Sequence, residues 1–129
     1  MTPRGCRQAE ALVTQLAGYP VARILSSPYL RCLQTVEPLA RARSLEVEGC
    51  PELGDDAEAA QALALLRELA GSPAVLCSHG DLMVELLDTL EAVDGLPLAP
   101  DYPCAKGSTW VLEDNGRRFI QAAYLPPAR

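Results

Sequence analysis

The amino-acid sequence predicts a three-layer α/β domain with a mostly parallel central sheet and a C-terminal hairpin. Short apolar segments rich in β-branched residues alternate along most of the chain with segments in which apolar residues recur at helical spacing. Strands that alternate with helices favour a parallel sheet covered by helices. Near the end of the chain, Asp114-Asn115-Gly116 separates two apolar segments, which is a strong hairpin signal.

Capping residues and hydrophobic spacing predict the individual elements. Thr2 followed by Pro3 is typical of a helix start, and Ser27 followed by Pro28 repeats this pair before a second helix. The segment at 74–77 is apolar without alternation, as expected of a strand buried on both faces. The expected helices cover about 3–17, 28–42, 57–70 and 82–91, and the expected strands cover 21–26, 45–48, 74–77, 108–113 and 118–124.

Composition excludes several classes of function. A chain of 129 residues, 49% of them hydrophobic, fits one compact domain over 1–129. No apolar run approaches the roughly 20 residues that span a bilayer, and the start lacks the apolar stretch of a signal peptide. The net charge of −6 disfavours a nucleic-acid partner. We therefore expect a cytoplasmic protein that binds neither membranes nor nucleic acid.

The five cysteines favour free thiols. Their number is odd and no two of them have the C-x-x-C spacing, so a disulfide framework or a structural zinc site is disfavoured. We expect no metal and no other cofactor.

Two strand-to-helix turns carry the residues suited to chemistry, at 26–31 and at 78–81. In open α/β sheets, ligands bind at the carboxyl ends of the strands, and helix N-termini there suit phosphate. Arg31 in a first helical turn can offer a bidentate guanidinium, and His79 can donate a hydrogen bond to a phosphoryl oxygen. Each residue alone is commonly structural, but their joint placement favours a phosphate site.

Four segments resemble the histidine phosphatase superfamily, which is phosphoglycerate-mutase-like. Ser26-Ser27-Pro28-Tyr29-Leu30-Arg31-Cys32-Leu33-Gln34-Thr35 resembles its S-S-P-x-x-R-x-x-Q-T signature, and Ser78-His79-Gly80 resembles its second histidine motif. The start at Thr2 is similar to the L-T-x-x-G-x-x-Q-A helix start. Lys106-Gly107-Ser108-Thr109-Trp110-Val111 resembles a late strand of actinobacterial members.

The resemblance implies hydrolysis of a phosphomonoester or a phosphohistidine protein through a phosphohistidine intermediate, without a metal. It implies that Arg31, His79 and Gly80 bind the phosphoryl group and that Arg31 and His79 also stabilise developing charge. A carboxylic acid often protonates the leaving group in the family. Asp55 follows Leu53 at the spacing of the family's L-x-E motif, so the resemblance makes it the candidate for this acid. Asp56 and Glu52 are acidic residues near it.

The sequence departs from the family in one respect: no R-H-G motif with the nucleophilic histidine precedes Thr2, and His79 is the single histidine. We expect the chain as given to be inactive or impaired. Either the start is misplaced, or the chain is a pseudo-phosphatase that binds phosphorylated ligands or protein partners; a phosphoglycerate-type mutase is a third reading.

In the family the first strand lies centrally in the sheet. Its absence predicts open edges on the strands that end at Ser26 and Cys77, and association between chains through them.

Overall fold

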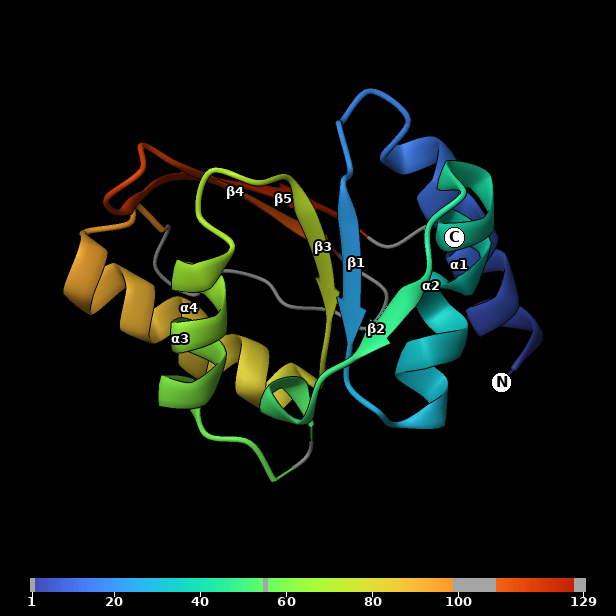
Figure 1. Ribbon diagram of the computed structural model, residues 1–129, viewed down its shortest axis with the longest axis horizontal. Helices are drawn as coiled ribbons and strands as arrows, with labels where there is room; N and C mark the ends of the chain where they lie inside the picture. The colour runs from blue at the N-terminus through green and yellow to red at the C-terminus, as the bar shows by residue number, and fades with distance from the viewer. Residues whose placement is uncertain (1, 55, 99–108, 127–129) are drawn as a thin grey trace.

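The computed structural model describes residues 2–54, 56–98 and 109–126 and shows the expected α/β fold, with helices around a small parallel sheet and a C-terminal hairpin (Figure 1). In chain order the elements are α1 (Pro3–Gln15), β1 (Arg23–Ser26), α2 (Leu30–Arg43), β2 (Val47–Gly49), the 3-10 helix η1 (Pro51–Leu53), α3 (Ala59–Glu68), β3 (Ala74–Cys77), α4 (Gly80–Asp94), β4 (Thr109–Asp114) and β5 (Phe119–Leu125).

The parallel sheet has the strand order β2-β1-β3. Strand β1 lies in the middle: Ile24 pairs with Val47 on one side and with Val75 on the other. The expectation that the strands ending at Ser26 and Cys77 are both open edges is therefore wrong for β1. The two strands pair directly with each other, in register from Arg23 opposite Ala74, and this ladder satisfies backbone groups that would otherwise be unpaired.

Helices cover both faces of the parallel sheet. Alternation along β1 directs Ile24 toward α1 and α2, where it packs with Leu12, Val36 and Leu39. The next residue, Leu25, faces the opposite side and packs with residues of α3 and α4, among them Leu65 and Leu82. The sequence prediction of three layers is confirmed by these two separate clusters.

The C-terminal hairpin forms a sheet of its own. Strands β4 and β5 pair antiparallel, with Trp110 opposite Tyr124 and a register shift after Glu113. Phe119 is buried with Leu66 of α3 and Leu90 of α4. The hairpin thus packs against the α3–α4 layer, and it does not fill a position in the parallel sheet.

The helix starts confirm one capping prediction and correct another. Thr2 caps α1 by accepting the backbone N–H of Gly5 at 3.0 Å, and Pro3 is the first residue of the helix. Ser27 does not cap α2, because Ser27 continues the extended strand and its N–H donates to the Cys77 carbonyl at 2.8 Å. Tyr29 is the N-cap of α2 instead.

Helix α3 begins two residues later than expected, where Glu58 and Gln61 form a capping box. Helix α4 begins earlier than expected, directly after His79. Within the described part of the chain, no helix combines the length and the apolar character needed to cross a bilayer.

Candidate phosphate site

The carboxyl ends of β1 and β3 bring the two predicted turns together. Ser26 and Cys77 are partners in the ladder, so the residues that follow them, Ser27 and Ser78, leave the sheet side by side. The hydrogen bond from the Ser27 N–H to the Cys77 carbonyl extends the pairing one residue beyond the strands. This register places 26–31 and 78–81 at the same edge, as the sequence predicted.

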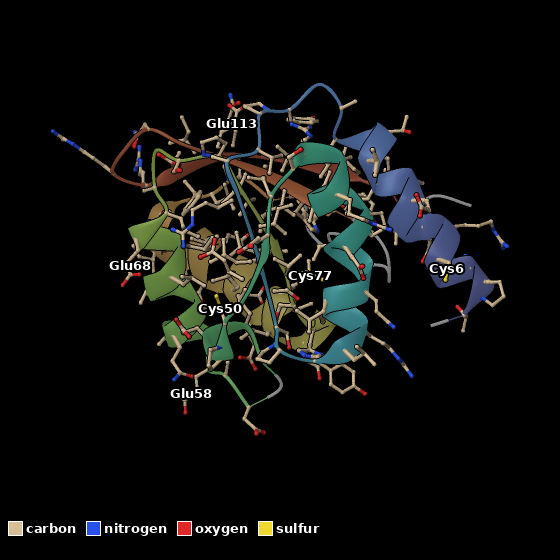
Figure 2. All side chains as sticks on the ribbon, turned by 45° about the vertical axis from the view of Figure 1, so that its right-hand side comes forward. Cys6, Cys50, Glu58, Glu68, Cys77 and Glu113 are labelled. Carbon is tan, nitrogen blue, oxygen red and sulfur yellow. The ribbon has the colours of Figure 1, made fainter. Side chains whose placement is uncertain are left out.

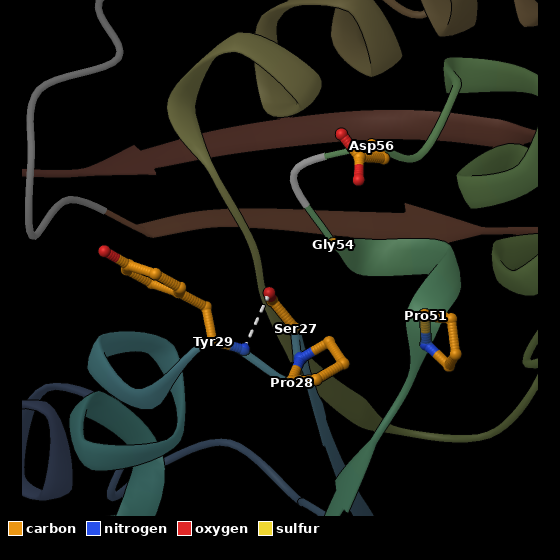
Figure 3. Close-up of a pocket in the computed structure, with 6 residues that line it drawn as sticks. All are labelled: Ser27, Pro28, Tyr29, Pro51, Gly54 and Asp56. Atoms are coloured by element: carbon orange, nitrogen blue, oxygen red, sulfur yellow. Dashed lines mark hydrogen bonds between the residues drawn. The ribbon is translucent and has the colours of Figure 1, made fainter.

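A direct contact joins the two turns. The hydroxyl oxygen of Ser27 lies 2.9 Å from Nε2 of His79. The same oxygen accepts the backbone N–H of Tyr29 at 3.2 Å, shown as the dashed line in Figure 3. Ser27 is fully buried, whereas His79 is half-buried at the N-cap of α4. The imidazole of His79 therefore contacts a hydroxyl that is buried in the protein.

Tyr29 adds an aromatic wall to the site. Its ring meets the His79 imidazole edge-on, with 5.5 Å between ring centroids and an interplanar angle of 61°, a favourable geometry for two aromatic rings. About half of Tyr29 is exposed to solvent. Sequence reasoning assigned no role to Tyr29; its position between the signature serine and Arg31 was the available signal.

An open cavity of about 430 Å³ lies beside this contact. Residues from two segments, one after β1 and one after β2, line it: Ser27, Pro28, Tyr29, Pro51, Gly54 and Asp56 (Figure 3). Its volume falls in the range of small-molecule sites. The cavity is not among the predictions made from the sequence, because it depends on how the turn after β1 meets the segment after β2.

Two further serine hydroxyls at this edge bind backbone carbonyls. Ser26 is fully buried, and its hydroxyl donates to the Ser27 carbonyl at 2.9 Å. Ser78 donates to the Leu53 carbonyl at 2.7 Å and so ties the end of β3 to η1. The hydroxyls of Ser26 and Ser78 therefore hold the backbone after β1 and the backbone after β3 in place. Of the three serines, Ser27 is the one whose hydroxyl contacts His79.

Arg31 and Gly80 lie in the first turns of the two helices that start at the site. Arg31 is exposed, two residues after Tyr29, and no ion pair is recorded for it among the described residues. Gly80 is the first residue of α4, and a Cβ added there would meet no atom within 4 Å. Both places can receive an anion, since the N–H groups of a first helical turn have no partner within their helix.

The candidate acids lie on the loop after η1. Asp55 falls outside the described residues, so its place is not compared with the prediction. Its neighbour Asp56 is exposed and lines the cavity opposite Tyr29 (Figure 3). Glu52 is half-buried within η1 and is not part of the lining.

The cysteines of the described segments are free thiols, as predicted. A hydrogen bond with Cys32 and burial together raise the pKa of the Cys77 thiol well above its usual range. Burial, followed by the charges of Glu52 and Glu48, raises the pKa of Cys50. Cys6 lies exposed on α1, far from both (Figure 2). Neutral thiols are weak nucleophiles, so a raised pKa makes Cys50 and Cys77 weaker nucleophiles near neutral pH.

The described residues contain no group of three or more His, Cys, Asp or Glu side chains that could hold a metal ion.

Fold and site together define an α/β domain in which the two motif turns meet at one edge of a parallel sheet. A family model, the histidine phosphatase superfamily (branch 1), matches residues 1–58. An 8-oxo-(d)GTP phosphatase of Mycolicibacterium smegmatis is 35% identical over 130 residues, which cover 96% of this chain and 40% of that protein. The family model and this relative both support the assignment of the chain to the histidine phosphatase superfamily.

Solved structures share the fold. A SixA protein of Nakamurella multipartitia, assigned as a phosphohistidine phosphatase, aligns over 100% of this chain and 85% of its own, with a TM-score of 0.75 and 19% identity. A mycobacterial glucosyl-3-phosphoglycerate phosphatase in complex with inorganic phosphate aligns over 96% of this chain and 84% of its own, with a TM-score of 0.65 and 17% identity. This chain spans about two fifths of the length of the M. smegmatis relative.

Proposed function

We propose that the edge formed by Ser27, Arg31, His79 and Gly80 binds the phosphoryl group of a phosphomonoester or phosphohistidine, and that the domain serves phosphatase chemistry. The contact between Ser27 and His79 carries this proposal, because it joins the two family motifs at 2.9 Å. The cavity beside it leaves room for the organic part of the ligand. The M. smegmatis relative acts on a nucleotide, as its name states, which supports a phosphorylated small molecule as ligand.

Binding at this edge has a direct physical basis. Helices α2 and α4 both begin here, and each helix N-terminus carries partial positive charge and unpaired N–H groups. The guanidinium of Arg31 supplies a full positive charge and a fork of donors that matches two phosphoryl oxygens. A chain with a net charge of −6 needs such a local positive site to hold an anion.

Turnover needs a nucleophile besides His79. In phosphatase chemistry of this type, a histidine nitrogen forms a bond to phosphorus while the ester oxygen leaves with a proton, and water then cleaves the P–N bond. This chain holds one histidine, and His79 already contacts Ser27 as part of the binding site. We therefore propose that the 129-residue chain binds phosphate but does not form the covalent intermediate.

Hydrolysis of p-nitrophenyl phosphate, with trapping of acid-labile phosphohistidine, tests this assignment. The 129-residue chain should show neither turnover nor a phosphohistidine burst, and a chain extended by an R-H-G segment before Thr2 should gain both. Turnover by the 129-residue chain at an ordinary enzymatic rate, lost in His79→Ala, would make His79 the nucleophile and contradict the proposed roles.

The second candidate is a non-catalytic module that binds phosphorylated ligands. The single histidine favours it. Phosphate binding by the 129-residue chain without any gain of turnover in the extended chain would select this candidate over the phosphatase.

A further inference from the structure

The hydroxyl of Ser27 makes two contacts among the described residues, and only one of them can use its proton. Ser27 is fully buried at the end of β1. Its oxygen accepts the N–H of Tyr29 at 3.2 Å and lies 2.9 Å from Nε2 of His79. A serine hydroxyl offers one proton and two acceptor positions. Within the described part of the chain, Nε2 of His79 is the contact of Ser27 that can accept this proton.

Two arrangements of protons fit the 2.9 Å contact. In the first, Ser27 donates to Nε2, so a neutral imidazole carries its proton on Nδ1. In the second, Nε2–H donates to Ser27, and the buried hydroxyl proton then needs a different acceptor. A buried donor without an acceptor is costly. The first arrangement satisfies the hydroxyl, and the Tyr29 N–H helps to orient the oxygen for it.

We propose that Ser27 is a positioning residue for His79: its hydroxyl donates to Nε2, which fixes the ring and keeps the proton of the neutral imidazole on Nδ1. Such a partner determines which tautomer of a histidine is present. The role of the tautomer in phosphoryl binding rests on the function proposed above, whereas the hydrogen bond itself does not. Ser26 provides a matched control, because it is equally buried and its hydroxyl donates to a backbone carbonyl.

Nitrogen-15 NMR of the intact 129-residue chain tests this directly, because a chain with one histidine gives one imidazole signal set. At about pH 9 an ordinary imidazole is neutral. We expect wild-type His79 in the Nδ1–H form. An Nε2–H form in the wild type would overturn the proposal without the need for any variant.

Ser27→Ala should shift the tautomer ratio toward Nε2–H by roughly tenfold, a factor typical of one hydrogen bond, and Ser26→Ala should leave the ratio unchanged. An unchanged ratio in Ser27→Ala would overturn the proposal. Titration with inorganic phosphate distinguishes the proposed phosphate binding from the proposed positioning role of Ser27. If the wild type does not bind phosphate, the proposed function fails, while the NMR result still decides the role of Ser27. We expect weaker phosphate binding in Ser27→Ala and wild-type affinity in Ser26→Ala.

Discussion

Asp94, the last residue of α4, accepts the backbone N–H of Phe119 at the start of β5, with 2.7 Å between Oδ2 and the nitrogen. Arg67 of α3 binds the same carboxylate through both of its terminal nitrogens. The guanidinium carbon also lies 5.8 Å from the centre of the Phe119 ring. One buried carboxylate thus joins α3, α4 and the hairpin, elements far apart in the sequence.

Replacing Asp94 should destabilise the fold. Asp94→Ala removes the acceptor of the Phe119 N–H and leaves Arg67 without its partner, so we expect a loss of about 2–4 kcal/mol in the free energy of unfolding. Urea denaturation measures it. The control is Glu48→Ala, which breaks the half-exposed pair with Arg23 and should change stability little. Similar losses in both variants would contradict a special role for the buried carboxylate.

Stability should also fall in acid in a way that depends on Asp94. The hydrogen bonds from Arg67, together with the N–H of Phe119, hold the pKa of Asp94 below its usual value, against the opposing effect of burial. A carboxyl whose pKa is lower in the folded chain stabilises the fold above its unfolded pKa of about 4, and this contribution is lost as the pH falls through the folded pKa.

Asp94→Asn should lack this contribution. The difference in urea midpoint between wild type and Asp94→Asn should be largest near about pH 7 and should shrink toward about pH 3. A difference that stays constant over this range would show that ionisation of Asp94 does not contribute to stability.

Arg31 should contribute to phosphate binding. Arg31→Ala removes a charged donor from the first turn of α2. We therefore expect the free energy of phosphate binding to become less favourable by about 1.5–3 kcal/mol. Titration calorimetry measures it, with Arg41→Ala as the control, because Arg41 lies exposed in the last turn of the same helix. Equal affinities of Arg31→Ala and the wild type would remove Arg31 from the site.

Association between chains should occur through β3. This strand pairs with β1 on one side, and no other described strand pairs with it; an open edge of apolar residues favours pairing between chains. We expect light scattering to show a mass that rises with concentration. A monomer with a sharply cooperative thermal melt at all concentrations would contradict the expectation.

The sequence alone predicted the class of fold, the hairpin and the meeting of the two motif turns. These predictions depend on local signals: hydrophobic period, turn residues, and the rule that parallel strands end at one edge. The start of α1 followed from Thr2 and Pro3 for the same reason, since a cap is made by residues three apart. The family resemblance also came from contiguous segments.

Other features depend on contacts between segments distant in the chain. The same serine-proline pair that suggested a helix start at Ser27 belongs instead to an extended segment, because the Cys77 carbonyl holds the Ser27 N–H. The expectation of an open edge on β1 was also wrong: β1 and β3 pair directly, since each provides the backbone partners that the other needs.

The sequence by itself determined which residues could bind a phosphoryl group, because charge, hydrogen-bonding capacity and position after a strand are properties of single residues and short segments. Only the tertiary structure decided that Ser27 contacts His79, that Tyr29 stands beside the imidazole, and that Asp56 lines the same cavity as Ser27 and Tyr29. The physical reason is register. The pairing of Ser26 with Cys77 sets which side chains meet, and no local pattern encodes a register between strands some 50 residues apart.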